Sequence, residues 1–166
     1  MPLKQSMHDN SIHRATLREF DEVYSIVQEY YEAARVVARD SREELERFYF
    51  GDGSGFWLAT HGSHTIGCIA LRPLAGIASA GEVKRLYVQP AHRGRRLAQA
   101  LYHALQTYAS TFGYQWLYLD TVHDMSAAIQ FYKSQGFAPC EKYNDNPQAT
   151  IFLRKALLSE LAPLPS

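Results

Sequence analysis

Apolar residues recur every three or four positions in two long segments of the chain, which predicts two amphipathic helices. The first helix begins at Phe20, and its apolar positions are Val23, Ile26, Val27, Tyr30, Ala34 and Val37. The second helix ends at Gly113, a residue typical of helix C-caps, and its apolar positions are Leu97, Leu101, Ala104, Leu105, Tyr108 and Phe112.

Two shorter helices are predicted from the residues at their ends. Ser41 and Glu44 fit a capping box at the start of one of them. Asp124 is expected to cap the other, which runs over residues 125–135 and ends at Gly136.

Runs of alternating or continuous apolar residues, bounded by glycine, proline and polar clusters, predict seven strands. The segments are 12–16, 56–60, 65–71, 81–90, 114–122, 137–143 and 149–154. The second and third are joined through HGSH, which predicts a hairpin. The order is strand, two helices, three strands, helix, strand, helix and two strands. This order indicates an α+β protein with a mixed sheet and a strand–helix–strand unit at its centre.

The length and charge of the chain limit what it does. A chain of 166 residues without repeats or a linker predicts a single domain over 1–166, with a loose tail over about 160–166. The formal net charge is +0, whereas a general nucleic-acid binder is usually basic, so any anion site must be local. The N-terminal segment lacks an apolar signal core, and no run approaches the about 18 apolar residues of a membrane span. A soluble, cytoplasmic protein without a membrane partner is expected.

Cysteine and histidine patterns do not indicate a metal site. Cys68 lies in an apolar stretch and Cys140 follows the last predicted helix, with no CxxC motif. Two buried, reduced thiols are expected. The seven histidines show no ligand spacing such as HExxH, so no metal cofactor is predicted.

The stretch YVQPAHRGRRLAQAL, residues 87–101, lies where a predicted strand turns into a predicted helix. The first turn of a helix has unpartnered backbone N–H groups and a partial positive charge, which suits phosphate. Gly94 lets the backbone approach closely, and Arg93, Arg95 and Arg96 can add charge-assisted hydrogen bonds. Taken alone, the stretch favours a solvated basic helix start. It lacks the Walker and GxGxxG patterns, which argues against a dinucleotide site.

A second motif changes that balance. Together with MSAAIQFYKSQGF, residues 125–137, the chain resembles the GCN5-related N-acetyltransferase (GNAT) superfamily over about residues 65–155. The superfamily motif V-x-P-x-x-R-G-x-G-[IL]-[GA]-x-x-L is matched by Val88, Pro90, Arg93, Gly94, Leu97, Ala98 and Leu101. The following motif A-x-x-x-Y-x-x-x-G-F is matched by Ala128, Tyr132, Gly136 and Phe137. Two motifs in order are far more specific than either alone.

The resemblance implies the acyl-CoA N-acyltransferase (GNAT) fold, with a mostly antiparallel sheet of about seven strands flanked by four helices. It implies transfer of an acetyl group from acetyl-CoA to a primary amine by direct attack in a ternary complex, without a covalent enzyme intermediate. A homodimer, common in this superfamily, is also compatible with it.

The resemblance also assigns roles to residues. The coenzyme pyrophosphate would rest on the turn formed by Arg93, Gly94, Arg95, Arg96, Leu97 and Ala98. The pantetheine arm would pair with the strand end formed by Leu86, Tyr87 and Val88, with the Val88 N–H facing the thioester oxygen. Ala128 and Tyr132 would border the coenzyme, with Tyr132 pointing at its sulfur.

The chain departs from the superfamily pattern at three places. Arg96 stands where glycine is usual, and Ala91 where Gln or Arg is frequent. Asp120-Thr121 stands where some members carry an asparagine. We expect the backbone still to reach the pyrophosphate, and Arg96 to add a contact.

The chemistry needs a base and an acid. An alkyl amine has a pKa of about 10.4, so at pH 7 about one molecule in a thousand is a free nucleophile. Glu82 is the predicted base, because its even spacing from Val88 puts both on one face of a strand. An exposed residue paired with Lys or Arg is the alternative for Glu82. Tyr132 is the predicted acid, since a phenol pKa of about 10 lies close to that of a thiol. For Tyr132 the alternative is a core tyrosine.

The acceptor is expected between the first helices and the loop joining the last two strands. The residues there include Tyr30, Tyr31, Tyr143, Asn144, Asp145 and Asn146. They suit a small-molecule or a peptide amine, and fold does not choose between these. A non-catalytic acyl-CoA-binding or regulatory domain is the alternative function. A nucleic-acid module using RGRR ranks third, because the net charge makes it improbable.

Overall fold

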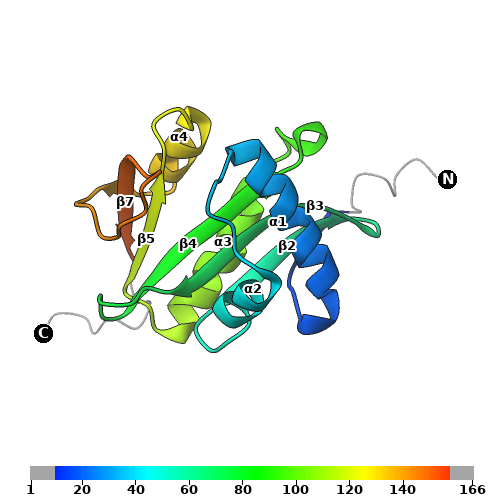
Figure 1. Ribbon diagram of the computed structural model, residues 1–166, viewed down its shortest axis with the longest axis horizontal. Coiled ribbons are helices and arrows are strands. Elements are labelled where there is room, and N and C mark those ends of the chain that lie inside the picture. Colours follow the sequence, from blue (N-terminus) through cyan, green and yellow to red (C-terminus); the bar gives the residue numbers. More distant parts are fainter. Residues whose placement is uncertain (1–9, 158–166) are drawn as a thin grey trace, which may run out of the picture.

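Residues 10–157 are described by a computed structural model, in which seven strands form one sheet (Figure 1). The strands are β1 (Asn10–Arg14), β2 (Gly55–His61), β3 (His64–Pro73), β4 (Ala80–Val88), β5 (Trp116–Thr121), β6 (Ala138–Pro139) and β7 (Ile151–Ala156). Their order across the sheet is β1-β2-β3-β4-β5-β7-β6. Every neighbouring pair is antiparallel except β4 and β5. The predicted mixed, mostly antiparallel sheet is confirmed.

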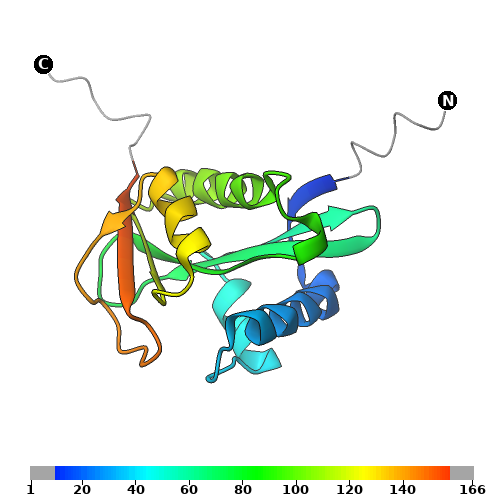
Figure 2. The ribbon, with the colours of Figure 1, turned by 90° about the horizontal axis from the view of Figure 1, so that it is seen from above.

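Helices cover both faces of this sheet (Figure 2). The helices are α1 (Phe20–Ala34), α2 (Arg42–Tyr49), α3 (Leu97–Phe112) and α4 (Ser126–Ser134). On the face of α1 and α2, Val23, Ile26 and Leu45 pack with Leu58 and Cys68. On the opposite face, residues of α3 and α4 pack with Ile69, Leu71 and Leu117. The predicted number and order of helices and strands are confirmed.

The predicted helix and hairpin ends are confirmed where a specific turn residue marks them. Ser41 Oγ accepts a hydrogen bond from the Glu44 N–H at 3.1 Å, and the Glu44 carboxylate accepts one from the Ser41 N–H. Gly113 is left-handed, with φ +110°, and ends α3. Gly62, with φ +59°, turns β2 into β3, and His61 pairs with His64.

The ends of α1 and α4 differ from the prediction. Helix α1 ends at Ala34 because Arg35 takes a left-handed conformation, with φ +54°. Val37, predicted on the apolar face, therefore lies beyond the helix and is 82% exposed. Met125 rather than Asp124 is the N-cap of α4, and no side chain caps this helix.

The first strand and the last hairpin also differ. Strand β1 spans 10–14 rather than 12–16 and pairs with β2 from Asn10 onward. Of the segment 137–143 only Ala138–Pro139 is a strand. Proline has no N–H for a sheet. The Cys140 N–H still donates to the Phe152 carbonyl of β7, and beyond Cys140 the chain leaves β7 and places Tyr143 against Glu82.

A bulge in β4 determines which side chains meet at the centre of the sheet. Lys84 pairs with Ala70 and Tyr87 with Cys68, so Ile69 opposes two residues, Arg85 and Leu86. The Arg85 backbone is left-handed there, with φ +62°. The extra residue reverses the alternation of faces along β4.

This reversal overturns the geometric reason for choosing Glu82 as the base. Val88 packs with the cluster on the α3 face. Glu82 instead pairs with Arg72, whose guanidinium lies over the ring of Phe48 of α2 on the other face. Even spacing puts two residues on one face only in a regular strand, and the bulge lies between these two.

Strands β4 and β5 diverge soon after they meet. Their parallel pairing covers Ala80–Trp116, Gly81–Leu117 and Glu82–Tyr118, and no pair follows. Beyond Glu82, therefore, one edge of β4 has no neighbouring strand, and a gap opens in the middle of the sheet.

The thiols differ from one another. Cys68 is buried, and this burial raises the pKa of its thiol. Cys140 is partly exposed, so the prediction of two buried thiols is wrong for this residue.

Among residues 10–157, no helix has the length and apolar character to cross a bilayer. The tail predicted to be loose lies outside the described residues.

Candidate active site

The turn before α3 exposes backbone donors. Gly94 and Arg96 are both left-handed, with φ +81° and φ +59°, and Arg96 is the N-cap of α3. No side chain caps the helix, its first turn holds no acidic residue, and its hydrogen bonding starts with the Ala100 N–H donating to the Arg96 carbonyl. The N–H groups of the first turn are therefore available to an anion, and the helix dipole favours negative charge there.

Arg96 adopts the conformation that glycine usually takes at this position of the superfamily pattern. The left-handed conformation costs a residue with a Cβ about 1–2 kcal/mol. At Gly94 a Cβ would meet no atom within 4 Å, so this glycine is needed for its backbone angle rather than for space within the protein. The turn therefore keeps the shape that the motif implies, with strain stored at Arg96.

A cavity of about 900 Å³ extends from this turn along the unpaired edge of β4. Nine of the predicted coenzyme residues line it: Leu86, Tyr87, Val88, Arg93, Gly94, Arg96, Leu97, Ala98 and Ala128. Arg95 is exposed and does not line it, and Tyr132 lines a neighbouring cavity. The structure thus brings nine of the eleven predicted coenzyme residues to one cavity.

The backbone of Val88 points into the gap. The Gln89 N–H donates to the Ile66 carbonyl of β3 at 2.8 Å. Because successive residues of a strand direct their N–H groups to opposite edges, the Val88 N–H points away from β3. Arg93 Nε donates to the Val88 carbonyl at 2.9 Å and holds the turn against the end of β4.

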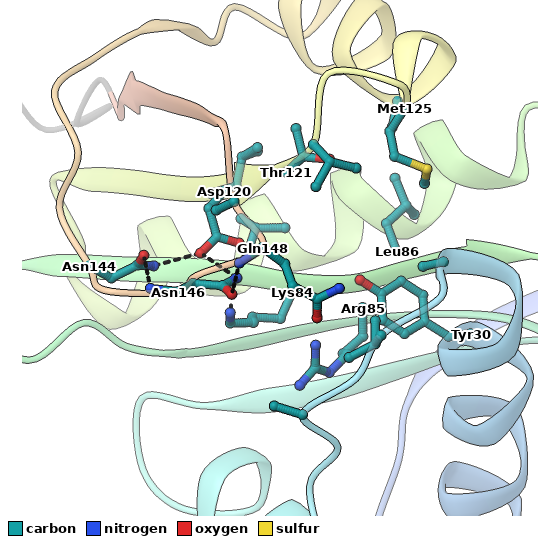
Figure 3. Close-up of a pocket in the computed structure, with 18 of the residues that line it drawn as sticks. Tyr30, Lys84, Arg85, Leu86, Asp120, Thr121, Met125, Asn144, Asn146 and Gln148 are labelled. Carbon is teal, nitrogen blue, oxygen red and sulfur yellow. Dashed lines mark hydrogen bonds and ion pairs between the residues drawn. The ribbon is translucent and has the colours of Figure 1, made fainter.

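A second cavity, of about 410 Å³, occupies the gap between β4 and β5 (Figure 3). Its wall includes Leu119 and Tyr132 from the α3 face, and Lys84 and Asp120 from the α1 face. It shares five lining residues with the larger cavity: Tyr30, Ala34, Leu86, Met125 and Ala128. The two cavities therefore adjoin, and the smaller one passes through the plane of the sheet.

Tyr132 is 6% exposed and packs among the rings of Tyr102, Phe131 and Phe137. Burial raises the pKa of its phenol, and the nearby Tyr30 adds to this rise. A raised pKa keeps the phenol protonated and excludes a role as base, but it also makes the phenol a weaker acid, so the closeness to a thiol pKa expected from the sequence is lost. Tyr132 is thus a buried aromatic core residue that also borders a cavity.

Glu82 does not line either of these two cavities. Its carboxylate, 1% exposed, accepts hydrogen bonds from Arg72 Nε at 3.0 Å, Tyr143 Oη at 2.7 Å and Asn144 Nδ2 at 3.3 Å. The alternative predicted for Glu82, pairing with a nearby arginine, is correct in that Arg72 binds it. The expected exposure is wrong.

Asp120 is the carboxylate that faces the smaller cavity. It accepts hydrogen bonds from Asn144 Nδ2 at 2.5 Å and Asn146 Nδ2 at 3.4 Å (Figure 3). Lys84 Nζ lies 3.9 Å from its Oδ1. The shared Asn144 links Asp120 to Glu82, so one carboxylate meets the cavity and the other lies behind it.

The predicted acceptor residues divide into two groups. Tyr30, Asn144 and Asn146 line the smaller cavity, whereas Tyr31, Tyr143 and Asp145 do not. Lys84, Arg85 and Asp120 also line the smaller cavity and were not predicted from the sequence. Asp120 could have been found, because it follows the fifth strand where some superfamily members carry an asparagine. No sequence signal marked the bulge that positions Arg85.

Metal chemistry has no support from residues 10–157, where no three His, Cys, Asp or Glu side chains gather into a ligand set. The residues around the two cavities offer backbone donors, a phenol, a carboxylate and cations.

Comparison with known proteins gives a consistent result. The profile of the Acetyltransferase (GNAT) family matches residues 20–137. An uncharacterized N-acetyltransferase of Schizosaccharomyces pombe is 30% identical over 149 residues, covering 86% of this chain and 91% of that protein. One from Escherichia coli is 26% identical, covering 80% of this chain and 78% of its own length. The crystal structure of a GNAT-family acetyltransferase from Staphylococcus aureus superposes with a TM-score of 0.77 at 18% identity, covering 90% of this chain and 99% of that one.

Proposed function

Because the chain belongs to the Acetyltransferase (GNAT) family, we propose that the larger cavity holds acetyl-CoA and that the smaller one receives the amine. The family assignment makes the chain an acetyl-CoA-dependent N-acetyltransferase. The identity of the acceptor and the roles of individual residues belong to the proposal.

One observation carries the assignment of the larger cavity. The left-handed turn at Gly94 and Arg96 leaves the first N–H groups of α3 open at one end of a cavity whose other end meets the unpaired edge of β4. The N–H groups of this turn would hold the pyrophosphate, and the arginine side chains of the turn would add charge. Leu86, Tyr87 and Val88 would pair with the pantetheine arm as an added strand.

The coenzyme supplies a thioester, and the chain supplies orientation, polarisation and proton transfer. The Val88 N–H, which points into the gap, would donate to the thioester oxygen and stabilise the negative charge that develops there. Attack forms the carbon–nitrogen bond and breaks the carbon–sulfur bond. Tyr132 would give its phenolic proton to the departing thiolate.

The proton lost by the amine needs a carboxylate or a water chain that leads to one. Asp120 faces the cavity, so we propose it as the group that meets the ammonium of the acceptor. Glu82 stays a predicted base that would act through the Tyr143 and Asn144 side chains bound to it, because its own carboxylate does not line the cavity.

The assignment is tested by calorimetric titration of the protein with acetyl-CoA, free CoA and ADP, followed by release of free thiol in the presence of an amine library. We expect micromolar binding of acetyl-CoA, much weaker binding of ADP, and thiol release with at least one amine. Binding without turnover of any amine would favour the non-catalytic alternative. Absence of acetyl-CoA binding would overturn the coenzyme site.

A further inference from the structure

We infer that the acceptor is a small free amino acid, whose carboxylate is bound by Lys84 and Arg85 while its ammonium meets Asp120. This inference rests on the proposed function, because it names the substrate class of the smaller cavity. Lys84 and Arg85 each keep at least one donor without a hydrogen-bond acceptor among the described residues, and the bulge in β4 brings the two side chains together.

Lys84 has unused donors at the cavity. Its side chain is 12% exposed, and its Nζ lies 3.7 Å from Glu82 and 3.9 Å from Asp120. Within the part of the chain that the structure describes, the ammonium makes no hydrogen bond to either. An ammonium has three donors, and leaving them unpaired in a largely buried place costs free energy. A ligand oxygen in the cavity would satisfy them.

Arg85 has the same property. Its side chain is 11% exposed and donates from Nη2 to Asp40 at 2.7 Å. Its Nε is buried and has no hydrogen-bond partner among the described residues. The rings of Tyr30 and Tyr31 lie 5.5 Å and 5.1 Å from the guanidinium carbon, so the guanidinium is held between α1 and Asp40.

The bulge puts both cations on one side of the sheet. In a regular strand the side chains of consecutive residues point to opposite faces. Lys84 pairs with Ala70, a residue of the α1-face cluster, and Arg85 contacts Tyr30 and Tyr31 of α1. Both cations lie near carboxylates, Lys84 near Glu82 and Asp120 and Arg85 beside Asp40, and the donors that these contacts leave unused can bind a ligand carboxylate.

Asp120 completes a pattern of opposite charges. Its carboxylate lies across the gap from Lys84, at 3.9 Å (Figure 3). The ammonium and carboxylate of an α-amino acid lie close together, so one molecule can pair with both residues. A protein lysine or a peptide N-terminus brings no carboxylate to this position, and a phosphate dianion would repel Asp120 more strongly than a singly charged carboxylate does.

The inference is tested by comparing acceptors that differ in one group. Free α-amino acids, β-alanine, the matching amino-acid amides, simple alkylamines and phosphoethanolamine are assayed for thiol release, with acetyl-CoA binding measured by calorimetry in parallel. We expect at least one free amino acid to have a kcat/KM about tenfold or more above that of its amide. Amides or alkylamines as good as the free acids, or phosphoethanolamine as the best acceptor, would overturn the inference and leave the acetyltransferase function intact.

Two further outcomes separate this inference from the function on which it rests. If acetyl-CoA binds but no member of the panel is acetylated, the amino-acid inference is wrong, whereas the coenzyme site stands. If acetyl-CoA does not bind at all, the proposed function fails first and the inference falls with it.

Variants of Lys84 test whether this residue causes the preference for free amino acids over their amides. Lys84→Met is expected to reduce the acid-to-amide ratio of kcat/KM about tenfold or more, mainly through the KM of the free acid. Lys84→Arg should restore part of the ratio, which a merely structural role would not predict. Lys142→Met, at a side chain 62% exposed, is the matched control and should leave the ratio unchanged. An unchanged ratio in folded Lys84→Met would remove Lys84 from the carboxylate site.

Discussion

Tyr143 donates a hydrogen bond of 2.7 Å to Oε2 of Glu82 and thereby ties the loop between β6 and β7 to the last residue of β4 that pairs with β5. Burial and the neighbouring carboxylate of Glu82 raise the pKa of the Tyr143 phenol, which stays a donor. Asn144, the next residue, bonds to both Glu82 and Asp120. The loop therefore fixes the two carboxylates relative to one another, and their roles can be separated by mutation.

The first prediction concerns these carboxylates. Asp120→Asn should lower kcat/KM at least a hundredfold, because it removes the carboxylate that we propose to meet the acceptor. Glu82→Gln should lower activity most at acid-to-neutral pH if Glu82 is the base. Asp145→Asn, at a fully exposed carboxylate of the same loop, is the control and should behave as the wild type. A Glu82→Gln profile of unchanged shape would leave Glu82 as a positioning residue only.

Tyr132→Phe should lower kcat about a hundredfold while leaving the Kd for acetyl-CoA nearly unchanged, because only the phenolic proton is lost. Tyr102→Phe is the matched control, since Tyr102 is also buried in the same aromatic cluster but its hydroxyl donates to Gln106. Thiol release measures kcat, and calorimetry measures Kd. A large loss of coenzyme affinity in Tyr132→Phe would make the tyrosine structural.

Gly94→Ala should lower both stability and coenzyme affinity. Gly94 and Gly62 are both left-handed, and a Cβ at either would meet no atom within 4 Å. Each alanine substitution should therefore cost about 1–2 kcal/mol of unfolding free energy from backbone strain. Only Gly94→Ala should also weaken acetyl-CoA binding in calorimetry, since Gly62 lies in the β2–β3 hairpin. Equal affinities of the two variants would contradict the pyrophosphate site at this turn.

Arg96→Gly should stabilise the protein by about 0.5–1 kcal/mol, because glycine adopts the left-handed N-cap conformation without a Cβ penalty. Arg96→Ala should not stabilise it, since alanine keeps the penalty and loses only the guanidinium. Urea unfolding measures both differences. Acetyl-CoA affinity should fall equally in the two variants if the guanidinium contacts the coenzyme, and a stability ranking of Ala above Gly would contradict the strain at this position.

Burial, with Tyr108 adding to the effect, raises the pKa of Tyr114 to about 12, and its hydroxyl donates to the Gly53 carbonyl. The folded state thus favours the neutral phenol. Its contribution is complete below the ordinary pKa of 10 and is lost as pH rises towards 12. Tyr114→Phe should be about 1 kcal/mol less stable than the wild type at pH 8, from the lost hydrogen bond. This difference should shrink above pH 10 in urea unfolding, and a constant difference would contradict the shift.

Most of the fold could be predicted from the sequence. Over most of the chain the helix caps and turn residues indicate the same elements as the spacing of the apolar residues. The Ser41 capping box, the Gly113 cap and the HGSH hairpin each depend on a few neighbouring residues, and each was found where expected. Errors occurred where long-range contacts decide. The last hairpin is shortened at Pro139 and by the hydrogen bond between Tyr143 and Glu82. The pattern of residues within the segment did not predict this shortening.

The residues that line the larger cavity could be predicted because the motif is contiguous and its turn has a defined shape; their binding of the coenzyme stays a prediction. The acceptor side could not, because its residues come from several segments. The bulge at Arg85 exchanges the faces of β4 without any glycine or proline to mark it. The even spacing of Glu82 and Val88 therefore predicts the wrong face for Glu82, because the bulge lies between them. Asp120 differs from the superfamily pattern, but this difference alone does not place it at the cavity.

The one extra residue in β4 also limits how this protein can vary in evolution. Deleting any residue between Glu82 and Val88 would restore regular alternation of side chains along β4. Either the pair Lys84 and Arg85 or the strand end Leu86–Val88 would then turn to the opposite face of the sheet. We therefore expect this strand to tolerate substitutions better than insertions or deletions. Length variation among relatives should therefore collect in loops such as 35–41 and 141–150, and alignments should run without gaps from Glu82 to the start of α3.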